Sequence, residues 1–417
     1  MSMSSEKQSS RLIRSVTERV RQSSLIPIFR VVARLIRRIV TIIYSPAAIV
    51  LLIFRIRLIT LTHPERIGHL CAEPDCYIKE GILGLRAKFN GIFLIPRDRV
   101  ANKVILDLWT KHLMVVTSPT VCMVLRPLLN YRFIKYPVDH YAVAIDGTAA
   151  CGAIFAKWGD RPPTLENEPE AYRPVGWRVL EELGLPSGSW FACVHSRDGY
   201  YSLHDEHLHS YRNTGIESYK LAMEAIIQRG GWCVRVGEPT PISMPNMPGL
   251  IDYANSSAKS DWMDVFLGAN CRFFLGNSSG LFWMSTIFSK HCALANLVPV
   301  SGALPPGRND LGIPKILRLL DSGQALSLRE ILDTSIANFR FTWQYEGAGI
   351  EVEENSPEDI RDLAIEVLDT LSGTLVYDAL DEQLQQRFYR LMRPGHYSFG
   401  AGSRIGRAFL RKYADLI

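Results

Sequence analysis

The chain of 417 residues lacks a CxxC pair, and none of its eight cysteines has a histidine partner at the spacing of a zinc finger. These absences argue against a structural zinc site. Several cysteines stand in short apolar runs, such as Phe191-Ala-Cys-Val194, where a buried thiol is common. We therefore expect reduced cysteines in the core, which points to a cytoplasmic protein.

The sequence also lacks internal repeats and low-complexity segments. Charged residues make up 21% and hydrophobic residues 47%, a composition typical of a folded globular protein rather than a disordered or fibrous one. Because 417 residues exceed what a single hydrophobic core usually organises, we expect two domains and an appendage.

A long uncharged run is missing as well. The uncharged stretch 39–54 has sixteen residues and contains Pro46, whereas a simple spanning helix needs about 20 apolar residues. Over residues 28–40, arginines alternate with apolar residues at helical spacing, a pattern typical of a helix that lies in a membrane interface. We expect residues 1–56 to associate with the inner face of the plasma membrane. An ordinary core helix, a partner-binding helix and a tilted span remain alternatives, and no cleavage site suggests a signal peptide.

Acidic residues are scarce at the N-terminus. Residues 1–57 contain eleven Lys or Arg and only Glu6 and Glu18, a net charge of +9. The remainder has 36 basic and 40 acidic residues and is slightly acidic. Segregated positive charge is expected of an arm that meets an anionic surface, and it argues against a nucleic-acid partner.

Beyond this arm, short apolar runs alternate with helical patterns, as parallel α/β sheets require. Strands are predicted at 58–62 and 91–95, with helices at 64–73 and 102–112. We expect a Rossmann-like domain over residues 57–180.

A Pro/Ser/Gly linker after Gly184 marks the crossover to a second Rossmann-like domain at 186–350. Its predicted strands are 190–195, 232–236, 271–275 and 292–295, with helices at 216–229, at 262–268 and from Ser279. Residues 351–417 are expected to form helices that pack back on the first domain. Ser356, Pro357 and Asp359 predict the start of one of them.

Polar and cationic residues follow the strands of the second domain. Ligands of open α/β sheets bind beyond the carboxyl ends of strands, so these residues belong together. They are His195-Ser-Arg197-Asp198, Arg235, and the loop Gly276-Asn277-Ser278-Ser279-Gly280. The backbone N–H groups and hydroxyls of this loop can surround phosphate oxygens at a helix start, although the same residues also form an ordinary tight turn.

Arg197, Arg212 and Arg235 are candidates for clamping a diphosphate, because a guanidinium binds phosphate at two points. A surface salt bridge is the alternative for each. Asp252 and Asp264 are candidates for contacts with ribose hydroxyls or a base, or else for capping helices. Asp261 is the expected cap of the helix that follows it.

The chain resembles a family of bacterial glycosyltransferases from surface-polysaccharide loci. Five segments carry this resemblance: Val194-His-Ser-Arg-Asp198, His209-Ser-Tyr-Arg-Asn213, Ile251-Asp-Tyr-Ala254, Ser260-Asp-Trp-Met-Asp-Val-Phe-Leu267 and Cys271-Arg-Phe-Phe-Leu-Gly-Asn-Ser-Ser-Gly280. The resemblance extends over residues 57–345 and includes Arg66-Ile-Gly-His-Leu70 and Pro96-Arg-Asp98. It implies a GT-B-like fold, in which two Rossmann-like domains face a cleft and the first domain holds the acceptor.

More distantly, His195-Ser-Arg197 resembles the His-x-Arg element of the α-1,6- and protein O-fucosyltransferases, which are GT-B enzymes that use GDP-fucose without a metal. In those enzymes this Arg and small hydroxyl residues at a later strand–helix junction contact the diphosphate. The resemblance therefore implies such contacts for Arg197 and for Ser278 or Ser279. A single Arg stands here where the α-1,6 enzymes have adjacent arginines, so the resemblance does not fix the donor, and GDP-fucose is only one option. The expected partner is a GDP- or UDP-linked nucleotide sugar.

The expected function is hexosyl or deoxyhexosyl transfer from a nucleotide sugar to a glycan or lipid-linked acceptor in surface-polysaccharide or glycoconjugate synthesis. No DxD motif is present, so we expect no metal or other cofactor. The base is expected in the acidic loop after Arg197, where Asp198, Asp205 and Glu206 should lie close to the leaving group. Asp205 and Asp198 are the preferred candidates, and His63 should face them from the first domain. A solvated loop is the alternative for Asp205. A sugar-nucleotide epimerase and a non-catalytic polysaccharide-assembly subunit remain alternative functions.

Overall fold

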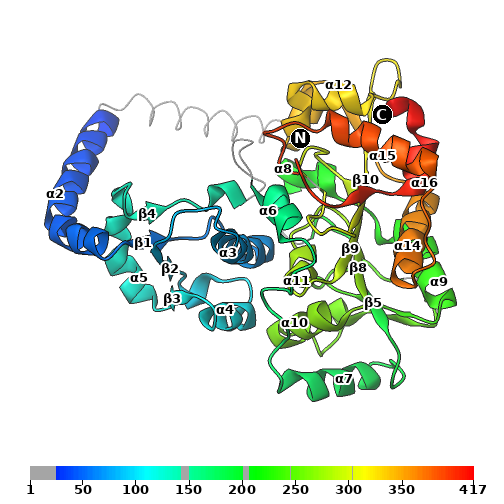
Figure 1. Cartoon of the computed structure of the whole chain (residues 1–417), viewed down its shortest axis with the longest axis horizontal. Coiled ribbons are helices and arrows are strands. Elements are labelled where there is room, and N and C mark those ends of the chain that lie inside the picture. The colour runs from blue at the N-terminus through cyan, green and yellow to red at the C-terminus, as the bar shows by residue number, and fades with distance from the viewer. Residues whose placement is uncertain (1–24, 142–149, 201–205, 245, 303) are drawn as a thin grey trace, which may run out of the picture.

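The computed structural model describes residues 25–141, 150–200, 206–244, 246–302 and 304–417. Within them, two parallel sheets stand side by side, each accompanied by helices (Figure 1). The predicted α/β class with two parallel sheets is confirmed. All eight cysteines are buried and free, as expected of core residues.

The first unit is built on a four-stranded sheet of order β3-β2-β1-β4. Every pairing in it is parallel. Its strands are β1 (Ile56–Ile59), β2 (Asn90–Leu94), β3 (Met114–Val116) and β4 (Lys135–Tyr136). Its helices are α3 (Ile67–Ile82), α4 (Lys103–Thr110), α5 (Pro119–Leu125) and α6 (Cys151–Trp158).

The second unit contains a seven-stranded sheet of order β13-β10-β9-β8-β5-β6-β7, again with parallel pairings. All residues of β5 and β8 are buried, because parallel sheets are covered on both faces. The strands are β5 (Phe191–Val194), β6 (Trp232–Arg235), β7 (Leu250–Ile251), β8 (Phe273–Gly276), β9 (His291–Leu297), β10 (Leu311–Pro314) and β13 (Arg404–Ile405). Its helices include α7 (Tyr172–Glu182), α8 (Glu206–His209), α9 (Lys220–Gln228), α10 (Asp261–Asn270) and α11 (Phe282–Thr286).

The C-terminal part adds helices and a small antiparallel pair to the second unit. These elements are β11 (Ile316–Leu319), α12 (Leu328–Leu332), α13 (Thr342–Gly347), β12 (Ile350–Glu353), α14 (Pro357–Leu371), α15 (Ala379–Leu391) and α16 (Arg407–Lys412). The predicted capping box of Ser356 and Asp359 at the start of α14 is confirmed. The C-terminal helices were expected to pack on the first unit, but α14 packs against α9 and β9 of the second unit. The segment 397–401 does reach the first unit, where Tyr397 Oη donates a hydrogen bond of 3.1 Å to Tyr141 O.

Two predicted helix starts are wrong in detail. Ser260 is the N-cap residue of α10, and Asp261 does not cap this helix. Instead, Asp261 Oδ2 accepts a hydrogen bond of 2.9 Å from the backbone N–H of Lys103, at the start of α4 in the other unit. The helix expected from Ser279 begins at Phe282 as α11, since the Ser279 hydroxyl accepts from the N–H of Leu281 at 3.2 Å and closes a turn first.

The N-terminal helix α2 (Leu25–Ile53) continues through Pro46 and borders the first unit at its outer edge (Figure 1). Ala48 of α2 is fully buried in a small core cluster with Leu58, Leu94 and Leu128. Among the described residues, the segment Arg34–Ile53 of α2 is long and apolar enough to span a membrane by length and composition.

The two units meet at the carboxyl ends of their strands. The turn after β1 leads into α3, and a Cβ built on Gly68 of α3 would lie only 2.8 Å from Gly280 Cα, after β8. Close backbone contact of this kind requires glycine on both sides. Nearby, Asn102 caps α4 through its side-chain oxygen and donates its Nδ2–H to Asp261 O at 2.9 Å. The loops that follow the strands of one sheet therefore face those of the other.

Candidate functional site

Asn277 joins three segments at the carboxyl edge of the second sheet. Its Oδ1 accepts from the backbone N–H of Arg197, after β5, at 3.1 Å. Its Nδ2 donates to Arg212 O at 3.2 Å. The side chain is completely buried. One amide therefore fixes the loops that carry two of the predicted diphosphate ligands.

Arg212 lies directly against the predicted phosphate loop. Its Nε donates to Ser278 O at 2.9 Å, and its second nitrogen Nη2 also contacts this carbonyl. The hydroxyl of Ser278 accepts from the N–H of Val298 at 3.0 Å, on the other side of the loop. The two serines of the loop, Ser278 and Ser279, thus use their hydroxyls to hold its shape.

Arg197 is held at the same place by its side chain. Its guanidinium donates to His209 O at 3.2 Å and to the Asn213 side chain. The carbonyl of Asn213 accepts from Lys315 Nζ at 2.8 Å, and Lys315 follows β10 directly. Lysine and arginine thus converge on Asn213 from two strands.

Burial disfavours the charged forms of the cluster Arg197, Arg212 and Lys315, and repulsion between cations adds to this effect. Burial lowers the pKa of Arg197 to about 10, and repulsion from Arg212 adds to this effect. Burial lowers the pKa of Lys315 to about 8, with Glu354 opposing and Arg197 reinforcing the shift. Cations whose charged forms are disfavoured in this way gain free energy from an added anion.

The structure places Arg235 and Asp252 beside this cluster rather than in it. Arg235 donates to Ile242 O at 2.8 Å and lies 3.4 Å from Asp252 Oδ2, so both hold the segment after β6. His195 precedes Arg197 by two residues, and its Nδ1–H donates to Val236 O at 3.0 Å. Burial lowers the pKa of His195 to about 4, and Arg235 and Arg197 contribute smaller decreases.

The predicted acidic residues are spread out. Asp264 accepts from Tyr253 Oη at 2.8 Å and pairs with Lys259, and burial raises its pKa. Asp198 accepts from the N–H of Tyr200 at 3.0 Å. Asp205 lies outside the described residues.

Glu206, next along the chain from Asp205, belongs to the cluster. One of its carboxylate oxygens accepts from the Asn213 amide, and its charge raises the pKa of Arg197. Its other oxygen is buried and has no hydrogen-bond partner among the residues that the structure describes.

The first unit contributes the start of α3 to this region. Arg66, the N-cap residue of α3, lies near enough to Arg212 and His209 to lower their pKa values, after the larger effect of burial. Two residues past the cap, Gly68 touches Gly280. The loop after β8 is therefore bordered by α3 as well as by the arginines.

A histidine–carboxylate pair spans the first two turns of α3. His69 Nδ1 lies 2.7 Å from Glu73 Oε1, and the other oxygen of Glu73 accepts from the N–H of Thr62 at 2.9 Å. Glu73 is completely buried, while 18% of the His69 side chain is exposed. The predicted His63 pairs with the exposed Glu65 at 2.9 Å and packs edge-on against His69, with ring centroids 5.2 Å apart.

Sequence reasoning missed Lys315, Arg66 and His69 as site residues. Lys315 follows the short strand Leu311–Pro314, whose proline and glycine hide the strand pattern. Arg66 and His69 stand inside a segment that carries the family resemblance, and the spacing of His69 and Glu73, one helical turn apart, was the available signal.

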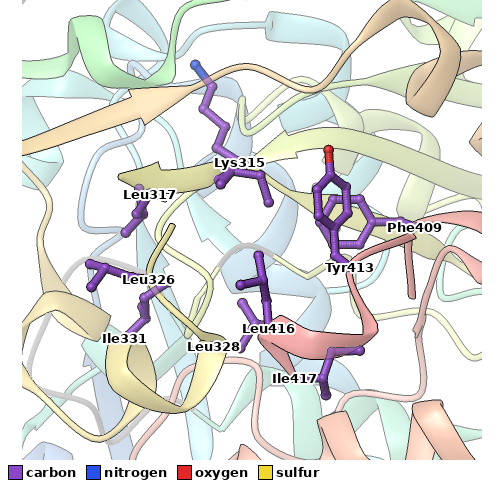
Figure 2. A pocket seen from close by; sticks show the side chains of 10 residues that line it. Lys315, Leu317, Leu326, Leu328, Ile331, Phe409, Tyr413, Leu416 and Ile417 are labelled. Carbon is purple, nitrogen blue, oxygen red and sulfur yellow. The ribbon is translucent and has the colours of Figure 1, made fainter. Parts of the chain in front are cut away.

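A small apolar pocket lies behind Lys315. Figure 2 shows it between Leu317, Leu326 and the C-terminal residues, with the Lys315 ammonium pointing away from it. The ammonium is therefore presented to the cationic cluster and the aliphatic stem to the pocket. Among the described residues, no group of three or more His, Cys, Asp or Glu side chains is arranged to hold a metal ion.

Comparison with known proteins gives no family model and no curated protein that matches. Among solved structures, the chain is similar to a glycosyl transferase family 9 protein of Veillonella parvula DSM 2008, with 10% identity, a TM-score of 0.34 and coverage of 58% of this chain and 80% of that one. It is also similar to the iron-containing dodecameric heptosyltransferase TibC, in complex with ADP-D-β-D-heptose, with 14% identity, a TM-score of 0.32 and 58% of each chain covered. TibC of enterotoxigenic E. coli H10407 matches with 13% identity, a TM-score of 0.31 and 58% and 57% covered. These likenesses are distant and span less than two thirds of TibC, so the function has to follow from the residues of this chain.

Proposed function

We propose that the protein is a glycosyltransferase that uses a nucleotide-diphosphate sugar. The observation that carries this proposal is the cluster Arg197, Arg212 and Lys315 at the carboxyl edge of the second sheet, where the pKa values of all three are lowered. Burial is the largest cause of each decrease, and repulsion between cations adds to it, so two negative charges of a diphosphate would favour the charged forms of all three side chains. The position matches the ligand-binding edge of open parallel sheets.

In the proposed reaction the cluster acts on the leaving group. As the bond between the anomeric carbon and the diphosphate breaks, its electron pair moves to a phosphate oxygen. Asn277 fixes the backbones of Arg197 and Arg212, while His209 O and Ser278 O hold their guanidinium groups. The two arginines are therefore positioned before the reaction and would stabilise this charge with little reorganisation. Because α11 has only five residues, the side chains rather than a helix dipole supply most of the positive charge.

For the base we propose His69, positioned by Glu73, in addition to the sequence candidates Asp205, Asp198 and His63. With its Nδ1–H donating to a buried carboxylate, His69 has its lone pair on Nε2. It would take the proton of the acceptor hydroxyl while that oxygen forms the new bond to the anomeric carbon. The neighbouring contact of Gly68 and Gly280 brings this helix turn next to the proposed diphosphate site.

The finer assignments belong to the same proposal. Donor binding is assigned to the cluster together with His195, Asn277 and the loop from Gly276 to Gly280. We propose a GDP- or UDP-linked hexose or deoxyhexose as donor and a glycan or lipid-linked acceptor in bacterial surface-polysaccharide synthesis, on the resemblance described above. The charge of the cluster and the missing DxD motif favour a reaction without a metal ion.

The variant His69→Gln tests this proposal in the full chain. We expect at least one of the GDP-, UDP-, dTDP- and CMP-sugars to raise the melting temperature of the wild type and of His69→Gln equally. Donor hydrolysis and transfer should fall by about 10²–10⁴-fold in the variant, because the base is lost. His112→Gln, an exposed histidine of the same unit, is the matched control and should behave as the wild type.

Arg197→Ala separates the two parts of the proposal, since it should lose the donor-induced stabilisation itself. If no nucleotide sugar stabilises the wild type, the proposed function is wrong. If donors bind and His69→Gln keeps the full rate, the base is elsewhere, and Asp205→Asn is then the decisive variant.

A further inference from the structure

The helix α2 packs on the first unit along its side. Ala48 is buried against the first unit, and Tyr44 and Leu51 of the same helix pack partly on that core cluster. Further toward the N-terminus, Thr41 O accepts a hydrogen bond from Tyr131 Oη. The stretch 41–51 is therefore attached sideways over nearly three turns, which is not the geometry of a helix that leaves the domain to cross a bilayer.

The rest of α2 exposes large apolar side chains. Ile42 is 71% exposed, and Ile43, Ile49, Leu52 and Ile53 are each at least half exposed. Closer to the N-terminal end of the helix, Leu35, Ile36 and Ile39 are similarly exposed. Soluble proteins rarely leave so much contiguous apolar surface in contact with water.

The neighbouring helix α5 continues this apolar surface. Met123 is 68% exposed, and Val121 and Val124 of the same short helix are also exposed. On the inner side, Cys122 of α5 and Ala48 of α2 belong to the same buried cluster. Both helices lie at the end of the first unit that is away from the second sheet (Figure 1). We call the exposed sides of α2 and α5 together the α2–α5 face.

Carboxylates are missing from the segments that form this face. Residues 25–57 and 114–138 contain nine Lys or Arg and no Asp or Glu. The exposed cations include Arg34, Arg37, Arg38, Arg126 and Arg132. Outside these segments, the acidic side chain of Asp98 lies near enough to α5 that its charge adds to the effect of burial in raising the pKa of Cys122. Apolar side chains next to arginines complement a bilayer surface that carries negative lipid headgroups.

We propose that the α2–α5 face is a docking surface for an anionic bilayer, such as the cytoplasmic leaflet, and that α2 lies in the interface without spanning it. The arginines contact headgroups and the apolar side chains of both helices enter the acyl boundary. The inference is independent of the proposed function, and it differs from an N-terminal anchor because α5, some seventy residues further along the chain, takes part.

Vesicle co-sedimentation of the full chain tests the docking surface. We expect binding to vesicles of phosphatidylcholine with phosphatidylglycerol, weaker binding to phosphatidylcholine alone, and a decrease with added salt. The double variant Met123→Ser, Val124→Ser should bind about tenfold more weakly, because two partly exposed apolar side chains no longer enter the bilayer. Arg37→Glu with Arg38→Glu should remove the preference for phosphatidylglycerol.

The matched control is Leu320→Ser with Val376→Ser, which alters two exposed apolar residues of the second unit and should leave binding unchanged. Unchanged circular dichroism and melting temperature show that each variant folds.

Full binding by the Met123, Val124 variant would overturn the part assigned to α5, and equal binding to both lipid mixtures would overturn the electrostatic part. Resistance of bound protein to alkaline carbonate would show that α2 spans. If the variants change the mass in light scattering but not vesicle binding, the face joins two copies and the proposal is wrong.

Discussion

Lys315 is the residue whose charge is most constrained by its surroundings at the site. It is nearly inaccessible, donates to Asn213 O at 2.8 Å, and has Glu354 at 4.0 Å as its ion-pair partner. Burial lowers the pKa of Lys315 from its ordinary 10.5 to about 8. A diphosphate beside Arg197 would favour the ammonium and raise this pKa again.

This shift predicts opposite pH dependences for the free and the ligand-bound protein. Between pH 8 and 10.5 the unfolded chain holds the Lys315 proton and the folded chain has lost it, so the contribution of Lys315 to the free energy of unfolding should rise with pH in this window and be lowest below pH 8. Stabilisation by a nucleoside diphosphate should instead weaken above pH 8, since the cation is lost. Thermal unfolding of the wild type and of Lys315→Met, with and without GDP or UDP, measures both. Identical pH profiles for the two proteins would contradict the assignment.

At this scale the sequence predicted some site residues and missed others for a physical reason. Arg197 and the loop of Asn277 follow hydrophobic strands directly, so their common edge could be inferred from chain order. The hydrogen bond from Arg212 to Ser278 O could not be inferred in this way, because Arg212 stands in a 3₁₀ turn that does not directly follow a strand. His69 was hidden because its role depends on which helix side faces the other unit.

At the scale of elements, the contact of α3 with the turn before α11 decides how the two sheets approach. A Cβ on Gly280 would lie 3.0 Å from both Cα and N of Gly68. Backbone atoms cannot move aside as a flexible side chain does. The relative position of His69 and Arg197 thus depends on two glycines that carry no chemistry themselves.

Gly280→Ala should therefore destabilise the protein by about 1–3 kcal/mol and reduce donor hydrolysis, because α3 must move away from the diphosphate loop. Gly347→Ala is the matched control: this glycine ends α13 and a Cβ there would meet no heavy atom within 4 Å. The control should be neutral or stabilise by up to about 1 kcal/mol. Urea unfolding and the hydrolysis rate report the two effects. A Gly280→Ala protein with wild-type stability and rate would show that the contact is not essential.

Element prediction succeeded where local signals were strong. The capping box at Ser356 and the buried strands β5 and β8 were readable from the sequence. Asp261 misled because its carboxylate caps α4 of the other unit, a long-range contact that no local pattern reveals. The helix α2 also runs through Pro46, where proline suggests a break.

At the scale of the whole molecule, the candidate site and the α2–α5 face lie in different places. The candidate site lies where the carboxyl edges of the two sheets meet, whereas the α2–α5 face lies at the far end of the first unit (Figure 1). The small core cluster beneath α2 connects this face to the first sheet, through Leu58 of β1 and Leu94 of β2. The helix is thus a structural part of the first unit as well as its proposed membrane contact.

Two truncations distinguish this double role from that of a detachable anchor. Removing residues 1–38 takes away described side chains that are exposed, so the melting temperature should stay near that of the full chain. Removing residues 1–53, up to the end of α2, also removes Ala48, Tyr44 and Leu51 and uncovers Leu58 and its neighbours. Loss of this packing should lower the free energy of unfolding by about 3–5 kcal/mol and promote aggregation. Equal melting temperatures of the two shortened chains would mean that α2 contributes nothing to the core of the first unit, and the sideways packing on which the membrane orientation rests would then be wrong.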